Sequence, residues 1–99
     1  MANVDWAYAI NNRRLVSFVY EGLERVVIPA AYGVNNQTRN RLVRAYQVAG
    51  RDATRSIPAW SLFREELVVN GAILDETFDE APPKYKRGDR AMDVIYAQL

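Results

Sequence analysis

Residues 14–29 of the chain, RLVSFVYEGLERVVIP, decide the fold. Residues 14–20 alternate between inward and outward positions, which is typical of a strand with one buried face. The Glu21-Gly22 pair predicts a tight turn, and residues 24–28 predict the return strand. Pro29 closes this hairpin, because proline cannot donate to a strand ladder. The apolar face of the first strand carries Val16, Phe18 and Tyr20.

Strand signals continue beyond the hairpin, separated by polar turns at 34–40 and 49–54. Residues 41–48 predict a third strand. Its alternation places four side chains on one face: Leu42, Arg44, Tyr46 and Val48. The later segments are an extended stretch over 55–62 where Pro58 marks an edge or a bend, a helical turn over 63–67, and a region over 68–78 with a turn signal at Asn70-Gly71.

A short helix is predicted at each end of the chain. The first covers residues 4–12, with Asn3 or Asp5 as its cap and Trp6 stacked on Ile10. A second helix is predicted over 89–99, with Asp89 as its cap and an apolar stripe that needs a covering surface. The stripe consists of Ala91, Met92, Ile95, Tyr96 and Leu99.

These elements predict a mainly β (α+β) protein. Several short strands with Gly/Pro-punctuated turns in fewer than 80 residues favour a small closed or nearly closed β-barrel, because a flat sheet of that size exposes an apolar face and two edges. We expect residues 1–80 to form the barrel with its N-terminal helix. Residues 81–99 then form an Ala81-Pro82-Pro83 linker and the C-terminal helix, which packs on the barrel or on a partner.

Composition excludes several kinds of chemistry. The chain has 99 residues, of which 49% are hydrophobic and 25% charged, as in a globular domain. It contains neither cysteine nor histidine, which excludes disulfides, imidazole or thiolate metal sites, cysteine nucleophiles and histidine-based triads. The acids between residues 65 and 80 lack the spacing of a calcium loop. We therefore expect no enzymatic activity, no cofactor and no metal.

The N-terminus is polar, and no stretch approaches the ~18 apolar residues of a membrane span. The expectation is a cytoplasmic protein with no membrane contact.

The charges are divided unevenly along the chain. Residues 1–64 hold nine arginines and four acids, whereas residues 65–99 hold four bases and eight acids. Arginine binds carboxylate and phosphate in a bidentate fork. The division therefore predicts either an anionic ligand or neutralisation of the arginines by the chain's own acidic part; an arginine-rich source genome is the alternative explanation.

Six short motifs follow one another within residues 7–78. They are Val16-Ser17-Phe18-Val19-Tyr20, Arg25-Val26-Val27-Ile28-Pro29, Ala30-Ala31-Tyr32-Gly33, Asn40-Arg41-Leu42-Val43-Arg44-Ala45-Tyr46, Phe63-Arg64 and Ile73-Leu74-Asp75-Glu76-Thr77-Phe78. In this order they resemble the WYL domain of bacterial transcriptional regulators. The sequence departs from that family in the naming triplet, of which only Leu42 is kept beside Asn40 and Arg41, and at Glu65-Glu66-Leu67, where a further arginine is expected.

The resemblance implies an SH3-like or Sm-like barrel. It also implies a sensing module that binds a negatively charged ligand, in some members a nucleotide or single-stranded nucleic acid, and acts on a transcriptional or defence-related partner. Because the chain begins with no helix-turn-helix, this sequence is expected to be a stand-alone version. The alternative is a small interaction or oligomerisation module that binds a partner protein through residues 89–99 and takes no small ligand.

Arg44 and Tyr46 are the first candidate ligand-binding residues, because an Arg fork beside a Tyr ring suits a phosphate and a base. The alternative is an Arg44 that lies over Tyr46 or pairs with Glu65 or Glu66. The resemblance places Arg64 at the ligand groove, with an exposed salt bridge as its alternative. The candidate set is completed by Arg41, Arg55 and Tyr20.

Two further features have competing interpretations. Trp60 is expected to fill the core of so small a barrel, with a stacking platform as the alternative. The basic cluster Lys84-Tyr85-Lys86-Arg87 is expected to be solvated, with nucleic-acid contact as the alternative.

Overall fold

The hairpin expected over residues 14–28 is present in the computed structural model, which describes residues 4–99. Its strands are β1 (Arg14–Tyr20) and β2 (Leu23–Val34), paired in register from Val16↔Val27 to Tyr20↔Leu23. Glu21 and Gly22 form the turn, with φ angles of 55° and 75°. Two consecutive positive φ angles are what a two-residue hairpin of the primed type requires, so the turn prediction is confirmed.

The expectation that Pro29 ends the second strand is wrong. β2 continues through this residue to Val34, and Pro29 pairs with Ala45 of the next strand. The register shifts between Pro29 and Ala31. A bulge of this kind accommodates a residue that has no N–H to donate. The strand therefore has a second half, residues 30–34, which pairs with a strand near the C-terminus of the chain.

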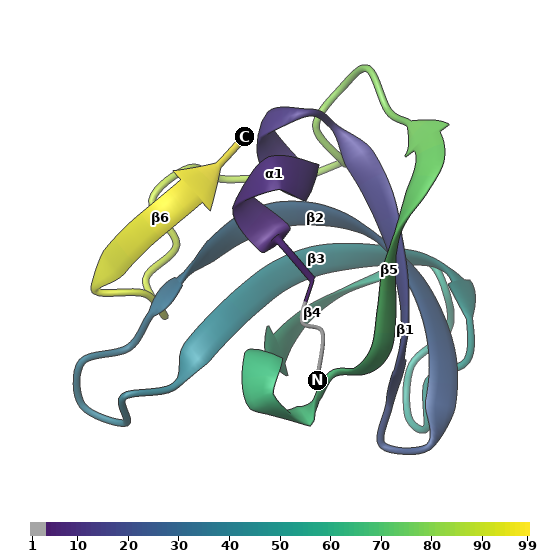
Figure 1. The fold of residues 1–99 in the computed structure, drawn as a ribbon, viewed down its shortest axis with the longest axis horizontal. Helices are drawn as coiled ribbons and strands as arrows, with labels where there is room; N and C mark the ends of the chain where they lie inside the picture. Colours follow the sequence, from purple (N-terminus) through teal and green to yellow (C-terminus); the bar gives the residue numbers. More distant parts are fainter. Residues whose placement is uncertain (1–3) are drawn as a thin grey trace.

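The remaining strands complete an antiparallel sheet with the order β4-β3-β2-β1-β5 (Figure 1). The expected third strand is confirmed as β3 (Arg41–Gly50), and the extended stretch becomes β4 (Ala59–Arg64). The expected helical turn is the 3-10 helix η1 (Glu65–Leu67), followed by β5 (Val69–Thr77).

Asn70-Gly71 is not a turn between strands. It lies inside β5, where Asn70 has a φ of 56° and the pairing with β1 shifts register between Ser17 and Val19. The positive φ that makes Asn-Gly a turn signal serves here to insert one extra residue as a bulge. A Cβ on Gly71 would lie 2.3 Å from Cγ2 of Val4, so the bulge also needs glycine for close packing.

The sheet curls until β1 and β4, which are not neighbours in it, meet across the core. The Phe63 ring lies edge-to-face on Phe18 and Tyr20, with centroid separations of 5.1 and 4.9 Å. The hydroxyl of Tyr20 accepts a hydrogen bond of 3.1 Å from the backbone N–H of Arg64. Aromatic edge-to-face pairs favour this arrangement beyond their buried area. The core is thus a cluster of rings between β1 and β4, which β2 and β3 separate in one curved sheet.

The N-terminal helix is confirmed as α1 (Trp6–Asn11). The Asp5 side chain caps it by accepting a 3.0 Å hydrogen bond from the N–H of Tyr8, whereas Asn3, the other expected cap, lies outside the described residues. Trp6 and Ile10 are 1% exposed and pack into the interior. Within residues 4–99, no helix has the length and apolar character needed to cross a membrane.

The C-terminal helix expected over 89–99 is wrong: this segment ends in a strand, β6 (Val94–Gln98). β6 pairs antiparallel with the second half of β2, from Ala31↔Gln98 to Val34↔Val94. Val, Ile and Tyr at its start favour a strand, and β2 offers an open edge. Of the predicted stripe, Met92 is 5% exposed, whereas Tyr96 is 50% exposed.

Gly33 permits this pairing. A Cβ at this position would lie 2.2 Å from the backbone oxygen of Val94, which cannot move without shifting β6.

We expect Gly33→Ala to release β6 from β2 and so to raise the hydrogen-exchange rate of residues 94–98. Gln37→Ala, in the exposed turn over 36–39, is the control and is expected to leave that exchange rate unchanged. Hydrogen-exchange mass spectrometry measures both variants, and continued protection of β6 in Gly33→Ala would contradict the close packing of Gly33 against Val94.

Arg25 is a buried cation that the sequence patterns did not predict. Arg25 is 3% exposed and contacts the Asp52 carboxylate at 3.0 Å, the Gln47 side-chain oxygen at 3.3 Å and the Tyr20 carbonyl at 3.2 Å. Its guanidinium also lies 5.5 Å from the centroid of the Phe63 ring. The backbone N–H of Thr54, followed by that of Arg55 and by Arg25 itself, lowers the pKa of Asp52 below its usual 3.8, so the pair is ionised at neutral pH.

Candidate functional site

The outward face of β3 and β4 carries the first candidate residues. Directly opposed residues of an antiparallel pair share a face. The register opposes Tyr46 to Trp60, Arg44 to Leu62 and Leu42 to Arg64. The prediction that Arg44 and Tyr46 share a face is therefore confirmed, and Arg64 lies on the same face nearer the end of β4.

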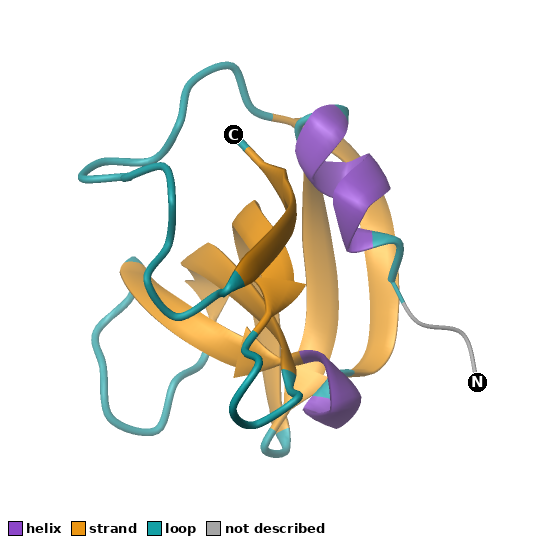
Figure 2. Cartoon of the chain, turned by 90° about the vertical axis from the view of Figure 1, so that its left-hand side faces the viewer, coloured by secondary structure: helices purple, strands orange, loops and turns teal. Residues whose placement is uncertain are grey.

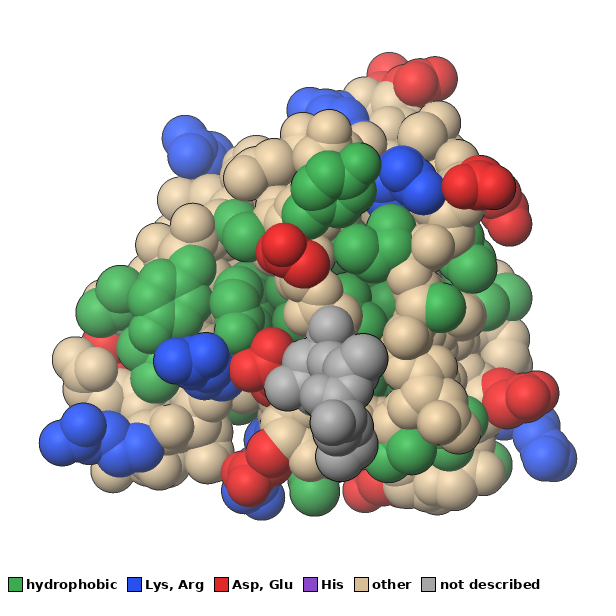
Figure 3. Space-filling model, viewed as in Figure 1, with side chains coloured by type: hydrophobic (Ala, Val, Ile, Leu, Met, Phe, Trp, Pro, Cys, Tyr) green, Lys and Arg blue, Asp and Glu red, His purple; other side chains and the backbone are tan. Residues whose placement is uncertain are grey.

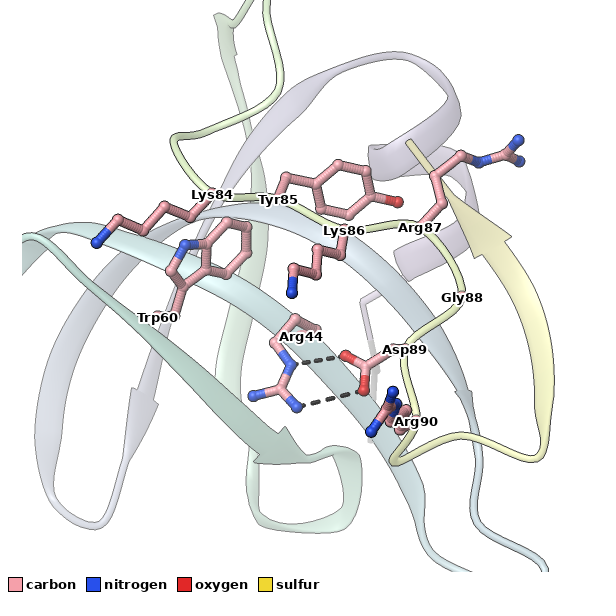
Figure 4. Close-up of a pocket in the computed structure, with 9 residues that line it drawn as sticks. All are labelled: Arg44, Trp60, Lys84, Tyr85, Lys86, Arg87, Gly88, Asp89 and Arg90. Carbon is pink, nitrogen blue, oxygen red and sulfur yellow. Dashed lines mark hydrogen bonds and ion pairs between the residues drawn. The ribbon is translucent and has the colours of Figure 1, made fainter.

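Residues 82–93, which we call the strap, cross this face on the way to β6 (Figure 2). Between the strap and the sheet is a cavity of about 590 Å³ (Figure 4). Among the residues that the structure describes, its lining includes five cationic side chains and one carboxylate. The lining residues are Arg44, Trp60, Lys84, Tyr85, Lys86, Arg87, Gly88, Asp89 and Arg90.

A row of three aromatic rings lies at the cavity: Trp60 and Tyr85 belong to its lining, and Tyr46 contacts Trp60 from outside the lining. The Tyr46 and Trp60 centroids are 5.2 Å apart, and those of Trp60 and Tyr85 are 6.3 Å apart with planes only 28° from parallel. The Trp60 indole N–H donates a 2.8 Å hydrogen bond to the Pro83 carbonyl, which holds the ring against the strap. Trp60 is half-buried and does not fill the core; that role belongs to Trp6.

Arg44 is paired, but not with either of the acids considered from the sequence. Its Nε and Nη2 donate to Oδ2 and Oδ1 of Asp89 at 2.6 and 3.3 Å. The two side chains are 32% and 10% exposed. Burial acts to raise the pKa of the Asp89 carboxyl, but the hydrogen bonds from Arg44 and from the Ala91 N–H outweigh it, and the pKa lies below its usual 3.8. The pair is therefore charged at neutral pH.

The strap is held in place by its own hydrogen bonds. The Asn35 side chain donates to the Ala91 carbonyl at 3.0 Å, and the Gly88 N–H donates to the Gln98 side chain at 2.9 Å. The Tyr85 hydroxyl donates to the Leu99 carbonyl at 2.9 Å. These three bonds use backbone and neutral groups, and none of them occupies a basic side chain of the strap.

The other predicted residues are not gathered at this cavity. Arg64 pairs with Glu66, and Arg41 lies over the Tyr96 ring with 5.9 Å to its centroid. Arg55 donates 2.6 Å hydrogen bonds to the Trp60 carbonyl and to the Ser61 hydroxyl, so it supports β4. Tyr20 is 8% exposed and belongs to the core. Of the six predicted residues, Arg44 lines the cavity, and the Tyr46 ring lies tilted against Trp60, which is part of the lining.

The sequence pattern led us to expect that the cluster Lys84-Tyr85-Lys86-Arg87 is solvated, with nucleic-acid contact as the alternative, and it did not single out Arg90; all of these residues line the cavity. Residues 84–90 read KYKRGDR, in which bases alternate with a tyrosine. That interleaving was the available signal, but nothing local indicated which face the segment would cover. Within residues 4–99 there is no cluster of acidic side chains arranged to hold a metal ion.

Comparison of the chain with family models, with curated proteins and with solved structures finds no match.

Proposed function

We propose that the strap cavity binds an anionic ligand that carries both phosphate and a planar ring: a nucleotide or a stretch of single-stranded nucleic acid. The observation that carries this proposal is the combination of the aromatic row Tyr46–Trp60–Tyr85, of which Trp60 and Tyr85 line the cavity, with five cationic residues in the same lining. Bases stack on aromatic rings irrespective of sequence, and Lys and Arg neutralise phosphates. A cavity with only one of these features would suit a simple anion or an apolar ligand instead.

The proposed role is that of a non-enzymatic sensing module of the WYL type, acting on a transcriptional or defence-related partner. The resemblance of residues 7–78 supports it, as does the place of Arg44 in the motif that runs from Asn40 to Tyr46. We further propose that the curved sheet is an SH3-like or Sm-like barrel. The strand order, the η1 turn between β4 and β5, and the ring contacts between β1 and β4 support this closure.

Salt dependence tests the binding proposal. A fluorescein-labelled oligothymidylate is titrated with wild type, Lys86→Gln, Arg90→Gln and the control Arg51→Gln, between about 50 and 200 mM salt. Each cavity variant that loses a phosphate contact is expected to weaken binding and to lower the slope of log K against log salt by about 0.7.

Arg51→Gln removes the same charge from an exposed position outside the cavity lining, so its slope is expected to match wild type. Equal effects of all three substitutions would show that only net charge attracts the probe, and absence of binding at low salt would refute the proposal.

A second candidate function is protein–protein contact through the C-terminal segment. Val94 and Tyr96 of β6 are 44% and 50% exposed, and apolar side chains are visible over α1 and β6 in Figure 3. Exposed large apolar groups that lie together are typical of interaction surfaces. Light scattering in the binding buffer separates the candidates: a monomer that binds the probe supports the first, and an oligomer with no affinity for it supports the second.

A further inference from the structure

We infer that Asp89 is a positioning residue for the strap cavity: it holds the Arg44 guanidinium so that its unpaired end faces the ligand. This inference rests on the proposed function and adds a role for the single carboxylate in the cavity lining of the described chain. An acid in a site proposed for anions needs an explanation, because by charge alone it repels the ligand.

The geometry of the guanidinium group provides that explanation. Arginine has five N–H donors and presents two bidentate edges, one formed by Nε with one Nη and the other by the two Nη atoms. Asp89 occupies the first edge through Nε and Nη2 of Arg44. Both hydrogens of Nη1 and one of Nη2 stay unpaired with it. In Figure 4 the free nitrogen of Arg44 points away from Asp89, so the second edge is available to a phosphate.

Asp89 is itself fixed. Its Oδ1 accepts a 2.9 Å hydrogen bond from the N–H of Ala91, and its side chain is 10% exposed. Met92, three residues further along the strap, is buried at 5% exposure against the sheet. An arginine held in one geometry before binding loses less side-chain entropy when it meets its ligand. The ion pair therefore organises the site in advance.

The direction in which Asp89→Asn changes the affinity for the anion shows whether Asp89 positions Arg44 or competes with the ligand. Asp89→Asn removes a negative charge, so a competing carboxylate predicts tighter binding of an anion. Positioning predicts the opposite: at about 150 mM salt, where exposed charges are screened, affinity for the labelled oligothymidylate falls about three- to tenfold. Asp89→Glu keeps the charge but displaces the carboxylate, and it is expected to weaken binding in the same direction.

The second test asks whether the effect of Asp89→Asn on affinity requires Arg44. Asp89→Asn is expected to have no weakening effect in an Arg44→Ala background, because a residue that acts through Arg44 has nothing left to position. Because its hydrogen bond to Asp89 ties down the Arg44 Nε proton, we expect this proton to exchange slowly with solvent in wild type and rapidly in Asp89→Asn without ligand, as measured by ¹⁵N-edited NMR. Thermal unfolding by circular dichroism confirms that each variant is folded.

The outcomes are distinct. Wild-type protein that binds no probe refutes the proposed function and this inference with it. Wild type that binds, with Asp89→Asn equal or tighter, refutes the inference alone and makes Asp89 a competing anion. Equal weakening by Asp89→Asn with and without Arg44 also refutes it, since the effect would then come from the strap backbone.

Discussion

Replacing Trp60 by alanine is expected to weaken binding of the labelled oligothymidylate about 5- to 150-fold, since stacking of one base on an aromatic ring contributes ~1–3 kcal/mol. Trp60 is the central ring of the row, with Tyr46 on one side and Tyr85 on the other. Its substitution also removes the hydrogen bond to the Pro83 carbonyl. Trp60→Phe keeps a ring but loses that bond, and we expect it to retain most of the affinity.

Tyr8→Ala is the matched control, because Tyr8 is an aromatic residue of α1, 47% exposed and absent from the cavity lining. Fluorescence anisotropy measures all three variants. The chain has two tryptophans, and Trp6 is 1% exposed in the core, so ligand-dependent quenching is expected to come from Trp60 alone. Unchanged affinity in Trp60→Ala would show that the ligand does not stack on the aromatic row.

Replacing Arg25 by alanine is expected to destabilise the fold more than any single change at the cavity. The substitution leaves the fully buried Gln47 oxygen without its donor and opens a void beside the Phe63 ring. Removing a buried, hydrogen-bonded cation costs about 3 kcal/mol or more of unfolding free energy. For a domain of this size, each kcal/mol lowers Tm by about 4–8 °C.

Urea denaturation followed by circular dichroism measures this effect. Arg51→Ala is the control, because Arg51 is exposed, and its change is expected to stay within about 0.5 kcal/mol. An Arg25→Ala protein within 1 kcal/mol of wild type, on the same order as a surface change, would show that the buried cation is dispensable for stability.

Local patterns predicted the elements that short-range geometry controls. The β1–β2 turn followed from Glu21-Gly22, and the shared face of Arg44 and Tyr46 followed from the two-residue period of β3. The same patterns failed at Pro29 and at Asn70-Gly71, where the backbone features typical of a strand end serve as bulges within continuous strands. A bulge depends on the neighbouring strand, which local sequence does not specify.

The sequence predicted only part of the candidate site, because the rest depends on long-range contacts. The Arg44 and Tyr46 pattern on β3 predicted one residue of the cavity lining, Arg44, whereas Trp60 was expected in the core. The strap side of the cavity depended on where the chain went after Pro83. The stripe from Ala91 to Leu99 fits a helix, but β2 offered an unpaired edge and Gly33 left room for β6. Tertiary pairing overrode the helical period.

By itself, the sequence determined a small β-rich domain without histidine or cysteine chemistry, and it placed Arg44 and Tyr46 together, because composition and strand alternation are local properties. Only the tertiary structure decided that Asp89, 45 residues away, binds Arg44, and that Lys86 and Arg90 line one cavity with Trp60. The cause is the pairing of β6 with β2, a long-range contact that pulls the strap across the face of β3 and β4.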